Sequence, residues 1–130
     1  MRFEGVAFAY PGGPRILADV SMEAAPGRTI ALVGQTGAGK STAMALLQRL
    51  WDPVEGRITL DGHDLRDLTL DSLRRNVGVV FQESLLFNRS IRDNLLVGRP
   101  DATQEDIERA CRMAEAHDFI SSKPQGYDTM

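Results

Sequence analysis

The chain has 130 residues, a length typical of one domain and sufficient to bury a core. Its 42% hydrophobic and 25% charged residues are ordinary for a globular protein, and a net charge of −3 argues against nucleic acid as a partner. Nothing resembles a signal peptide or the roughly 20 apolar residues that cross a bilayer, so the chain by itself is predicted to be cytoplasmic.

Two antiparallel strands are predicted at the start of the chain. Apolar and polar residues alternate over residues 2–10, and residues 16–24 form a second stretch of this kind. Between them, the segment Pro-Gly-Gly-Pro at 11–14 predicts a turn, because proline fixes φ and glycine permits a positive φ.

Two short apolar runs are typical of strands that are buried on both faces of a parallel sheet. They are residues 29–33 and 77–81. Helices are predicted at 40–50 and 70–76, and a strand at 57–60 is followed by a turn at Asp61 and Gly62.

The C-terminal third is predicted to be helical. Residues 91–97 form one helix, and Thr103 is expected to cap a second that runs to about His117. Cys111, the only cysteine, falls in this second helix, which indicates a buried and unreactive thiol. The segment 123–126 near the end of the chain shows no regular pattern.

A glycine-rich segment separates the predicted strand 29–33 from the predicted helix 40–50. It matches the phosphate-binding pattern G-x-x-x-x-G-K-[ST] at every fixed position. Its residues are Gly34, Gln35, Thr36, Gly37, Ala38, Gly39, Lys40 and Ser41. A preceding strand and a following helix are the context that this pattern requires, so we predict that the segment binds a nucleoside triphosphate.

The residue types of this loop suit polyphosphate chemistry. Glycines let backbone N–H groups approach the β-phosphate, where a side chain would intervene. Lys40 is expected to reach the β- and γ-phosphates and is a candidate catalytic residue. The Ser41 hydroxyl is expected to ligate Mg²⁺, and Thr42 to add a hydroxyl near the α-phosphate. A nucleoside triphosphate and Mg²⁺ are therefore the expected ligands, although the loop does not say which nucleotide is bound.

The segments around the loop resemble the nucleotide-binding domain of ABC exporters. Residues 3–10 are similar to the opening strand of that family, and the resemblance implies that Tyr10 stacks on adenine. Residues 53–62 are similar to its antiparallel hairpin. The implied fold is α/β: a P-loop NTPase with a RecA-like parallel sheet core and an antiparallel β subdomain.

Residues 79–83 resemble the Q-loop of the family. The resemblance implies that Gln82 contacts Mg²⁺ or the attacking water, as a second catalytic candidate, and signals to the transmembrane domain. Residues 86–95 are similar to exporters rather than importers, so Leu85, Leu86 and Phe87 are implied to help receive a coupling helix of that domain. Ordinary core packing of these three side chains remains the alternative.

The resemblance covers residues 1–130 but only the N-terminal portion of the family's domain, which is truncated before the helical signature region. The L-S-G-G-Q signature and the strand ending in Asp-Glu do not occur, and neither His63 nor His117 matches the switch histidine. Glu83 and Asp61 cannot replace these groups, so no catalytic base is assigned. We expect ATP·Mg²⁺ binding at best, negligible hydrolysis, and poor solubility, because strand edges are left unpaired.

The resemblance also implies a setting for the parent protein. It would lie at the cytoplasmic face of the cell membrane and pair with a second nucleotide-binding domain over two ATP molecules. Residues 87–101 look most like exporters of cyclic β-glucan, although lipid and drug exporters share most of this segment.

Two alternatives remain open at the level of the sequence. One is another P-loop enzyme, although a GTPase lacks its Asn-Lys-x-Asp run here and Arg74 and Arg75 are weak evidence for a kinase lid. The other is a non-catalytic nucleotide-binding or interaction fragment.

Overall fold

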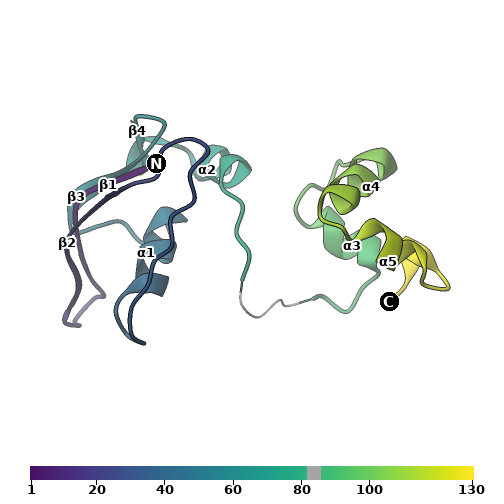
Figure 1. The fold of residues 1–130 in the computed structure, drawn as a ribbon, viewed down its shortest axis with the longest axis horizontal. Coiled ribbons are helices and arrows are strands. Elements are labelled where there is room, and N and C mark those ends of the chain that lie inside the picture. The colour runs from purple at the N-terminus through teal and green to yellow at the C-terminus, as the bar shows by residue number, and fades with distance from the viewer. Residues whose placement is uncertain (82–85) are drawn as a thin grey trace. The chain divides into compact units, whose positions relative to one another are not determined.

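The computed structural model describes residues 1–81 and 86–130. The chain divides into two compact units, Met1–Val79 and Val80–Met130, where its length predicted one domain. Figure 1 shows the strands in the first unit and three labelled helices in the second. Among the described residues, no helix combines the length and the apolar character needed to span a bilayer.

The first unit contains a four-stranded antiparallel sheet with the strand order β2-β1-β3-β4. Its strands are β1 (Arg2–Ala9), β2 (Arg15–Glu23), β3 (Glu55–Leu60) and β4 (His63–Asp64). The predicted hairpin of the first two strands is confirmed, as is the turn at 61–62, where both residues have positive φ.

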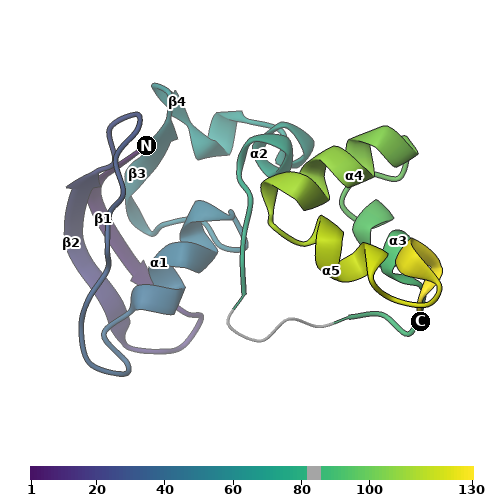
Figure 2. The same ribbon diagram turned by 45° about the vertical axis from the view of Figure 1, so that its right-hand side comes forward.

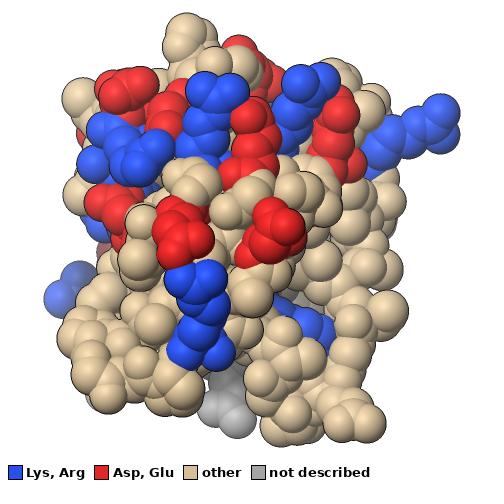
Figure 3. All heavy atoms as spheres, turned by 90° about the vertical axis from the view of Figure 1, so that its left-hand side faces the viewer, with Lys and Arg blue, Asp and Glu red and all other residues tan. Residues whose placement is uncertain are grey.

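Ion pairs link neighbouring strands across the sheet. Arg2 lies opposite Glu23 in the β1–β2 register and Glu4 lies opposite Arg57 in the β1–β3 register, with closest N–O distances of 2.9 and 2.8 Å. Figure 3 shows acidic and basic side chains intermixed on the side of the molecule where Figure 1 draws these strands. Such exposed pairs add little stability individually, but opposite charges favour this register over its alternatives.

The core of the first unit lies between the sheet and the helices α1 (Lys40–Leu47) and α2 (Leu70–Asn76). Figure 2 shows α1 beside the sheet. The helix ends earlier than predicted, because Arg49 adopts a positive φ of 53°. The α2 bounds are as predicted, and the Thr69 hydroxyl accepts a hydrogen bond from the Ser72 N–H at its start. The buried core residues are Phe3, Val6, Phe8, Leu17, Ala43, Leu46, Ile58, Leu65 and Leu73.

The two predicted parallel strands are wrong as assignments of secondary structure. Residues 29–33 and 77–81 contain no strand, and within the described ranges the strands form only the antiparallel sheet. The side chains of Val33 and Val80 are 89% and 97% exposed. A strand requires a hydrogen-bonding neighbour, and in the described part of the chain none lies alongside either run. The RecA-like parallel core is therefore not formed by these residues.

The second unit packs three short helices around its own small core. They are α3 (Ile91–Leu96), α4 (Gln104–Met113) and α5 (His117–Ser121), followed by the 3₁₀ turn η2 (Gly126–Asp128). The predicted capping role of Thr103 is confirmed by a reciprocal pair of bonds with Asp106. The core is formed by Ile107, Cys111, Ile120 and Tyr127, so the predicted burial of the thiol is also confirmed.

One prediction for this unit was wrong. The helix that starts after Thr103 ends at Met113 rather than near His117. Glu115 has a positive φ of 55°, so the chain turns there and cannot continue the helix. The next helix, α5, begins at His117, and η2 begins at Gly126, the last residue of the segment that showed no pattern. Ile120 and Tyr127 complete the core, a non-local contact that periodicity does not reveal.

Candidate functional site

The glycine-rich loop leads directly into α1 within the first unit. Gly37 and Gly39 have φ values of 86° and 85°, a region that disfavours any side chain. A Cβ atom built on Gly39 would lie 2.6 Å from Cδ2 of Leu17 and 3.3 Å from Cγ2 of Ile16. Strand β2 thus presses against the start of the helix, and only glycine fits at that point.

Backbone amides of the loop remain available for a ligand. The Ala38 N–H donates to the Gln35 carbonyl at 3.2 Å, the one backbone hydrogen bond found inside the loop. Within the described part of the chain, the amides of Gly37 and of residues 39–42 donate to no backbone or side-chain acceptor of the protein. Because these amides stand at a helix start, they form a cluster of donors suited to an anion.

Lys40 folds back over the loop that precedes it. Its Nζ donates to the carbonyl oxygens of Gly34 and Gln35, each at 2.7 Å. An ammonium group has three donors, so one remains after these two bonds. No carboxylate among residues 1–81 and 86–130 pairs with this cation. Among the described residues, the positive charge of the loop is therefore not compensated by an ion pair.

The two hydroxyl residues after Lys40 differ in their surroundings. Ser41 is exposed beside the loop, where its hydroxyl can meet a phosphate-bound cation. Thr42 is buried, with its hydroxyl 3.4 Å from that of Tyr10. No group of three acidic, histidine or cysteine side chains capable of holding a metal occurs among the described residues. The donor set fits Mg²⁺ that arrives with its phosphates and needs few protein ligands.

Tyr10 lies immediately after β1 in a group of three aromatic rings. Its ring is nearly perpendicular to that of Phe8, with centroids 4.9 Å apart, and to that of Trp51, at 5.5 Å. Phe8 and Trp51 also lie 6.2 Å apart. The structure thus brings Tyr10 together with Thr42 at the start of α1, as the predicted site requires.

The other predicted contact residues are described only in part. Gln82, Glu83 and Leu85 lie outside the described residues. Leu86 and Phe87 are 80% and 58% exposed, so neither is an ordinary core residue in the described structure.

A single side chain organises the backbone next to these exposed residues. The Asn94 amide accepts a hydrogen bond from the Phe87 N–H at 2.8 Å and donates one to the Phe87 carbonyl at 3.0 Å. It also donates to the carbonyls of Arg89 and Ser90. These contacts hold the residues that precede α3 in a defined conformation.

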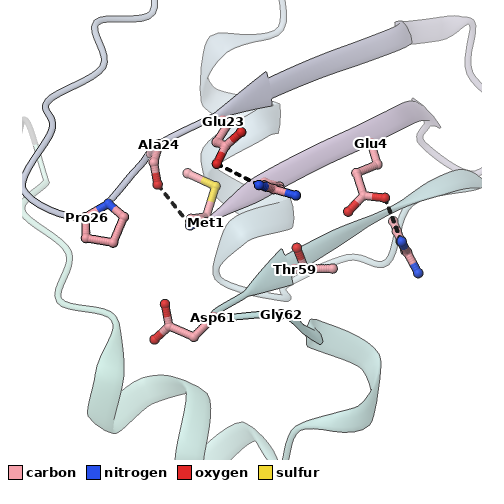
Figure 4. A pocket seen from close by; sticks show the side chains of 10 residues that line it. Met1, Glu4, Glu23, Ala24, Pro26, Thr59, Asp61 and Gly62 are labelled. Carbon is pink, nitrogen blue, oxygen red and sulfur yellow. Dashed lines mark hydrogen bonds and ion pairs between the residues drawn. The ribbon is translucent and has the colours of Figure 1, made fainter.

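A separate open pocket of about 430 Å³ lies at the opposite end of β1 from Tyr10. Figure 4 shows Glu4 and Glu23 beside arginine partners, and the Met1 amino group beside the Ala24 carbonyl. No residue of the loop 34–41 lines this pocket, so it is separate from the phosphate site.

Sequence reasoning missed two contributors to the site. Leu17, which requires glycine at position 39, resembled any other apolar strand residue. Trp51 followed the predicted helix 40–50 and carried no motif, although it is the only tryptophan in the chain. Both act through contacts with residues more than 20 positions away.

Comparisons with known proteins identify the family of the chain. Residues 17–129 match the family model described as ABC transporter. A β-(1→2)glucan export ATP-binding/permease protein NdvA from Rhodopseudomonas palustris (strain BisB18) is 60% identical over 129 residues, which are 99% of this chain and 21% of that protein. The protein of the same name from Nitrobacter winogradskyi is 57% identical with the same coverage.

A solved structure agrees with the sequence comparisons. It is that of a bacterial Atm1-family ABC exporter with ATP bound. The match covers 98% of this chain and 22% of the exporter chain, with a TM-score of 0.90 and 45% sequence identity. The chain spans about a fifth of the length of the curated relatives. Because the family model covers most of the chain, including the phosphate loop, the chain belongs to the ABC transporter family.

Proposed function

We propose that the chain binds ATP·Mg²⁺ through the loop 34–41, as the N-terminal portion of the nucleotide-binding domain of an exporter. The observation that carries the proposal is the cluster of amides at residues 39–42, which have no acceptor among the described residues, beside the Lys40 ammonium, which has no carboxylate partner there. Free N–H groups at a helix start and a fixed positive charge together stabilise a polyphosphate anion. Tyr10 at the end of β1 supplies an aromatic surface for adenine.

Each loop residue has a distinct part in this proposal. The amides hold β-phosphate oxygens, while the remaining donor of Lys40 reaches toward the γ-phosphate. Gly37 and Gly39 let the backbone turn without a Cβ in the path of the anion. The Ser41 hydroxyl would ligate Mg²⁺, and Gln82 would contact Mg²⁺ or the attacking water. Mg²⁺ would supply charge neutralisation between the β- and γ-phosphates.

The setting of the whole protein is proposed from its relatives. The names of these relatives combine ATP binding with a permease, which indicates a nucleotide-binding domain joined to a membrane domain. We infer a parent protein of this kind for the chain. Its ATP hydrolysis would drive export across the cell membrane, with this domain on the cytoplasmic face. The relatives' names make β-(1→2)glucan the proposed substrate.

Two protein contacts belong to the same proposal. The exposed Leu86 and Phe87, with Leu85, would meet the transmembrane domain, because large apolar side chains on a surface favour a partner. A second nucleotide-binding domain would complete the ATP site by bringing its signature to the γ-phosphate, and no catalytic base is assigned in this chain. Hydrolysis by the chain alone is therefore expected to be negligible.

Calorimetry of nucleotide binding tests the proposal. ATP and GTP are titrated into the chain with and without Mg²⁺, and into the Lys40→Ala and Lys123→Ala variants. Lys123 is a matched control because it lies in the second unit, over the ring of Phe119. Lys40→Ala should weaken ATP binding about 10- to 100-fold, the range for a lost charged hydrogen bond, and Lys123→Ala should leave it unchanged. Equal affinity of the two variants for ATP would refute the assignment.

A phosphate-release assay tests the absence of a catalytic base. The chain should show turnover close to that of a blank with ATP and Mg²⁺. Robust release that Lys40→Ala abolishes would show that the missing signature and catalytic base are dispensable for hydrolysis.

A further inference from the structure

We propose that Trp51 is a positioning residue that holds the ring of Tyr10 at a set distance from the phosphate loop. Trp51 would thereby determine how well the site binds the base of a nucleotide, while leaving phosphate binding unaffected. The inference rests on the proposed function, because it assigns adenine to Tyr10.

The orientation of the Tyr10 ring is defined by its two aromatic neighbours. The interplanar angle is 85° with Phe8 and 86° with Trp51, at centroid distances within the range of favourable aromatic pairs. Phe8 is 3% exposed and belongs to the core, so its ring is held in place on one side of Tyr10. Trp51 is the partly exposed member, at 44%, and contacts the ring from a different segment of the chain. Without the indole, the Tyr10 ring would lose one of these two contacts.

Core packing alone does not account for Trp51. Its side chain is absent from the buried core of the first unit and nearly half of it faces solvent. A large apolar side chain held in that position combines partial burial with its contacts to the two rings.

The backbone that carries Trp51 is anchored to the helix of the phosphate loop. The Leu50 N–H donates to the Ala45 carbonyl at 2.9 Å, which ties the end of the helix to its last turn. Arg49 donates to the Leu68 carbonyl at 2.7 Å and to the Asp52 carboxylate at 3.3 Å. Trp51 therefore moves with α1, the same helix whose first amides face the loop.

Two tethers thus connect Tyr10 to α1, one at each end of the helix. At the start, its hydroxyl lies 3.4 Å from that of Thr42. Beyond the C-terminal end, its ring meets Trp51. Because the base and the phosphates of one nucleotide must be bound together, a fixed spacing between ring and loop lowers the cost of ordering the site.

The test compares ATP with inorganic triphosphate, which has the phosphates without the base. Affinities are measured by calorimetry in the presence of Mg²⁺ for the chain and for Trp51→Ala, Trp51→Phe, Tyr10→Ala and the double variant Tyr10→Ala/Trp51→Ala. Phe119→Ala removes an exposed aromatic ring from the second unit as a matched control. Circular dichroism of every variant checks that the sheet and helices are retained.

Trp51→Ala should weaken ATP binding about 3- to 10-fold, the range expected for one aromatic pair, with triphosphate affinity unchanged. Trp51→Phe should restore most of the loss, because it keeps a ring beside Tyr10. The double variant should bind ATP no worse than Tyr10→Ala, since Trp51 acts through that ring.

Three results would overturn the proposal. The first is an equal loss for ATP and triphosphate in Trp51→Ala, which indicates general destabilisation. The second is a loss in Trp51→Ala with none in Tyr10→Ala, which makes Trp51 itself the base platform. The third is unchanged ATP affinity in Trp51→Ala while Lys40→Ala still weakens triphosphate binding, which leaves the proposed function intact. If Lys40→Ala does not weaken triphosphate binding, the proposed function itself fails.

Discussion

Gly39 combines two constraints in one residue of the loop. Its φ of 85° disfavours a side chain, and the space where a Cβ would stand is occupied by Leu17 of β2. Gly12 shares the first constraint only: its φ is 72°, and a Cβ there would meet nothing within 4 Å. The two glycines therefore separate backbone strain from steric contact.

Gly39→Ala should lower the free energy of unfolding by more than Gly12→Ala. The strain common to both is about 1 kcal/mol, and the displacement of the buried Leu17 adds to it only at position 39. Only Gly39→Ala should also weaken ATP binding, because it moves the start of α1. Urea denaturation and calorimetry measure the two effects, and equal losses in both variants would contradict the role of Leu17.

At the scale of an element, the second unit depends on the tail after α4. Tyr127, in η2, is 7% exposed, and its hydroxyl lies 2.9 Å from Nδ1 of His117 at the start of α5. Burial raises the pKa of Tyr127 to about 12 from its usual 10.0, and the neighbouring Cys111 adds to the shift. The neutral phenol is thus part of the packed helical unit.

This raised pKa predicts a loss of stability in alkali. The unfolded chain releases the phenol proton near pH 10 and the folded chain only near pH 12, so the stabilisation is complete below about pH 10 and is lost as the pH rises toward 12. Tyr127→Phe should reduce this dependence, whereas Tyr10→Phe should retain it. Thermal unfolding followed by circular dichroism over this range measures the difference. Parallel pH profiles for the chain and Tyr127→Phe would exclude the buried phenol as its source.

At the scale of the whole molecule, apolar runs remain in solvent. Val33 and Val80 are almost fully exposed in segments whose composition is that of buried strands. An extended apolar segment without strand neighbours exposes unpaired N–H and C=O groups, which can pair with another chain. The apolar composition of these runs predicts strands, whereas the lack of strand neighbours among the described residues leaves them irregular in the structure.

The chain should therefore associate as its concentration rises. Replacing both valines, as Val33→Lys/Val80→Lys, should reduce association, because charge opposes edge-to-edge pairing. Val97→Lys, at the end of α3, is a matched control with a 54% exposed side chain. Sedimentation velocity over a range of concentrations measures the effect. A monomer at every concentration, or equal suppression by the control, would refute the prediction.

The sequence by itself determined the features that depend on neighbouring residues. The phosphate loop, the β1–β2 hairpin, the bounds of α2 and the cap at Thr103 all follow from patterns a few residues long. Turn residues, capping hydroxyls and glycines act on adjacent backbone, so their effect is legible without a fold. The segments around the loop also indicated the family, which the comparisons show.

Only the tertiary structure decided what depends on residues far apart. It left 29–33 and 77–81 without strand partners, split the predicted last helix at Glu115, and placed Leu17 against Gly39 and Trp51 against Tyr10. Strand pairing and ring packing require two distant segments to meet, and the free energy of that contact belongs to the pair. No local pattern in either segment contains it.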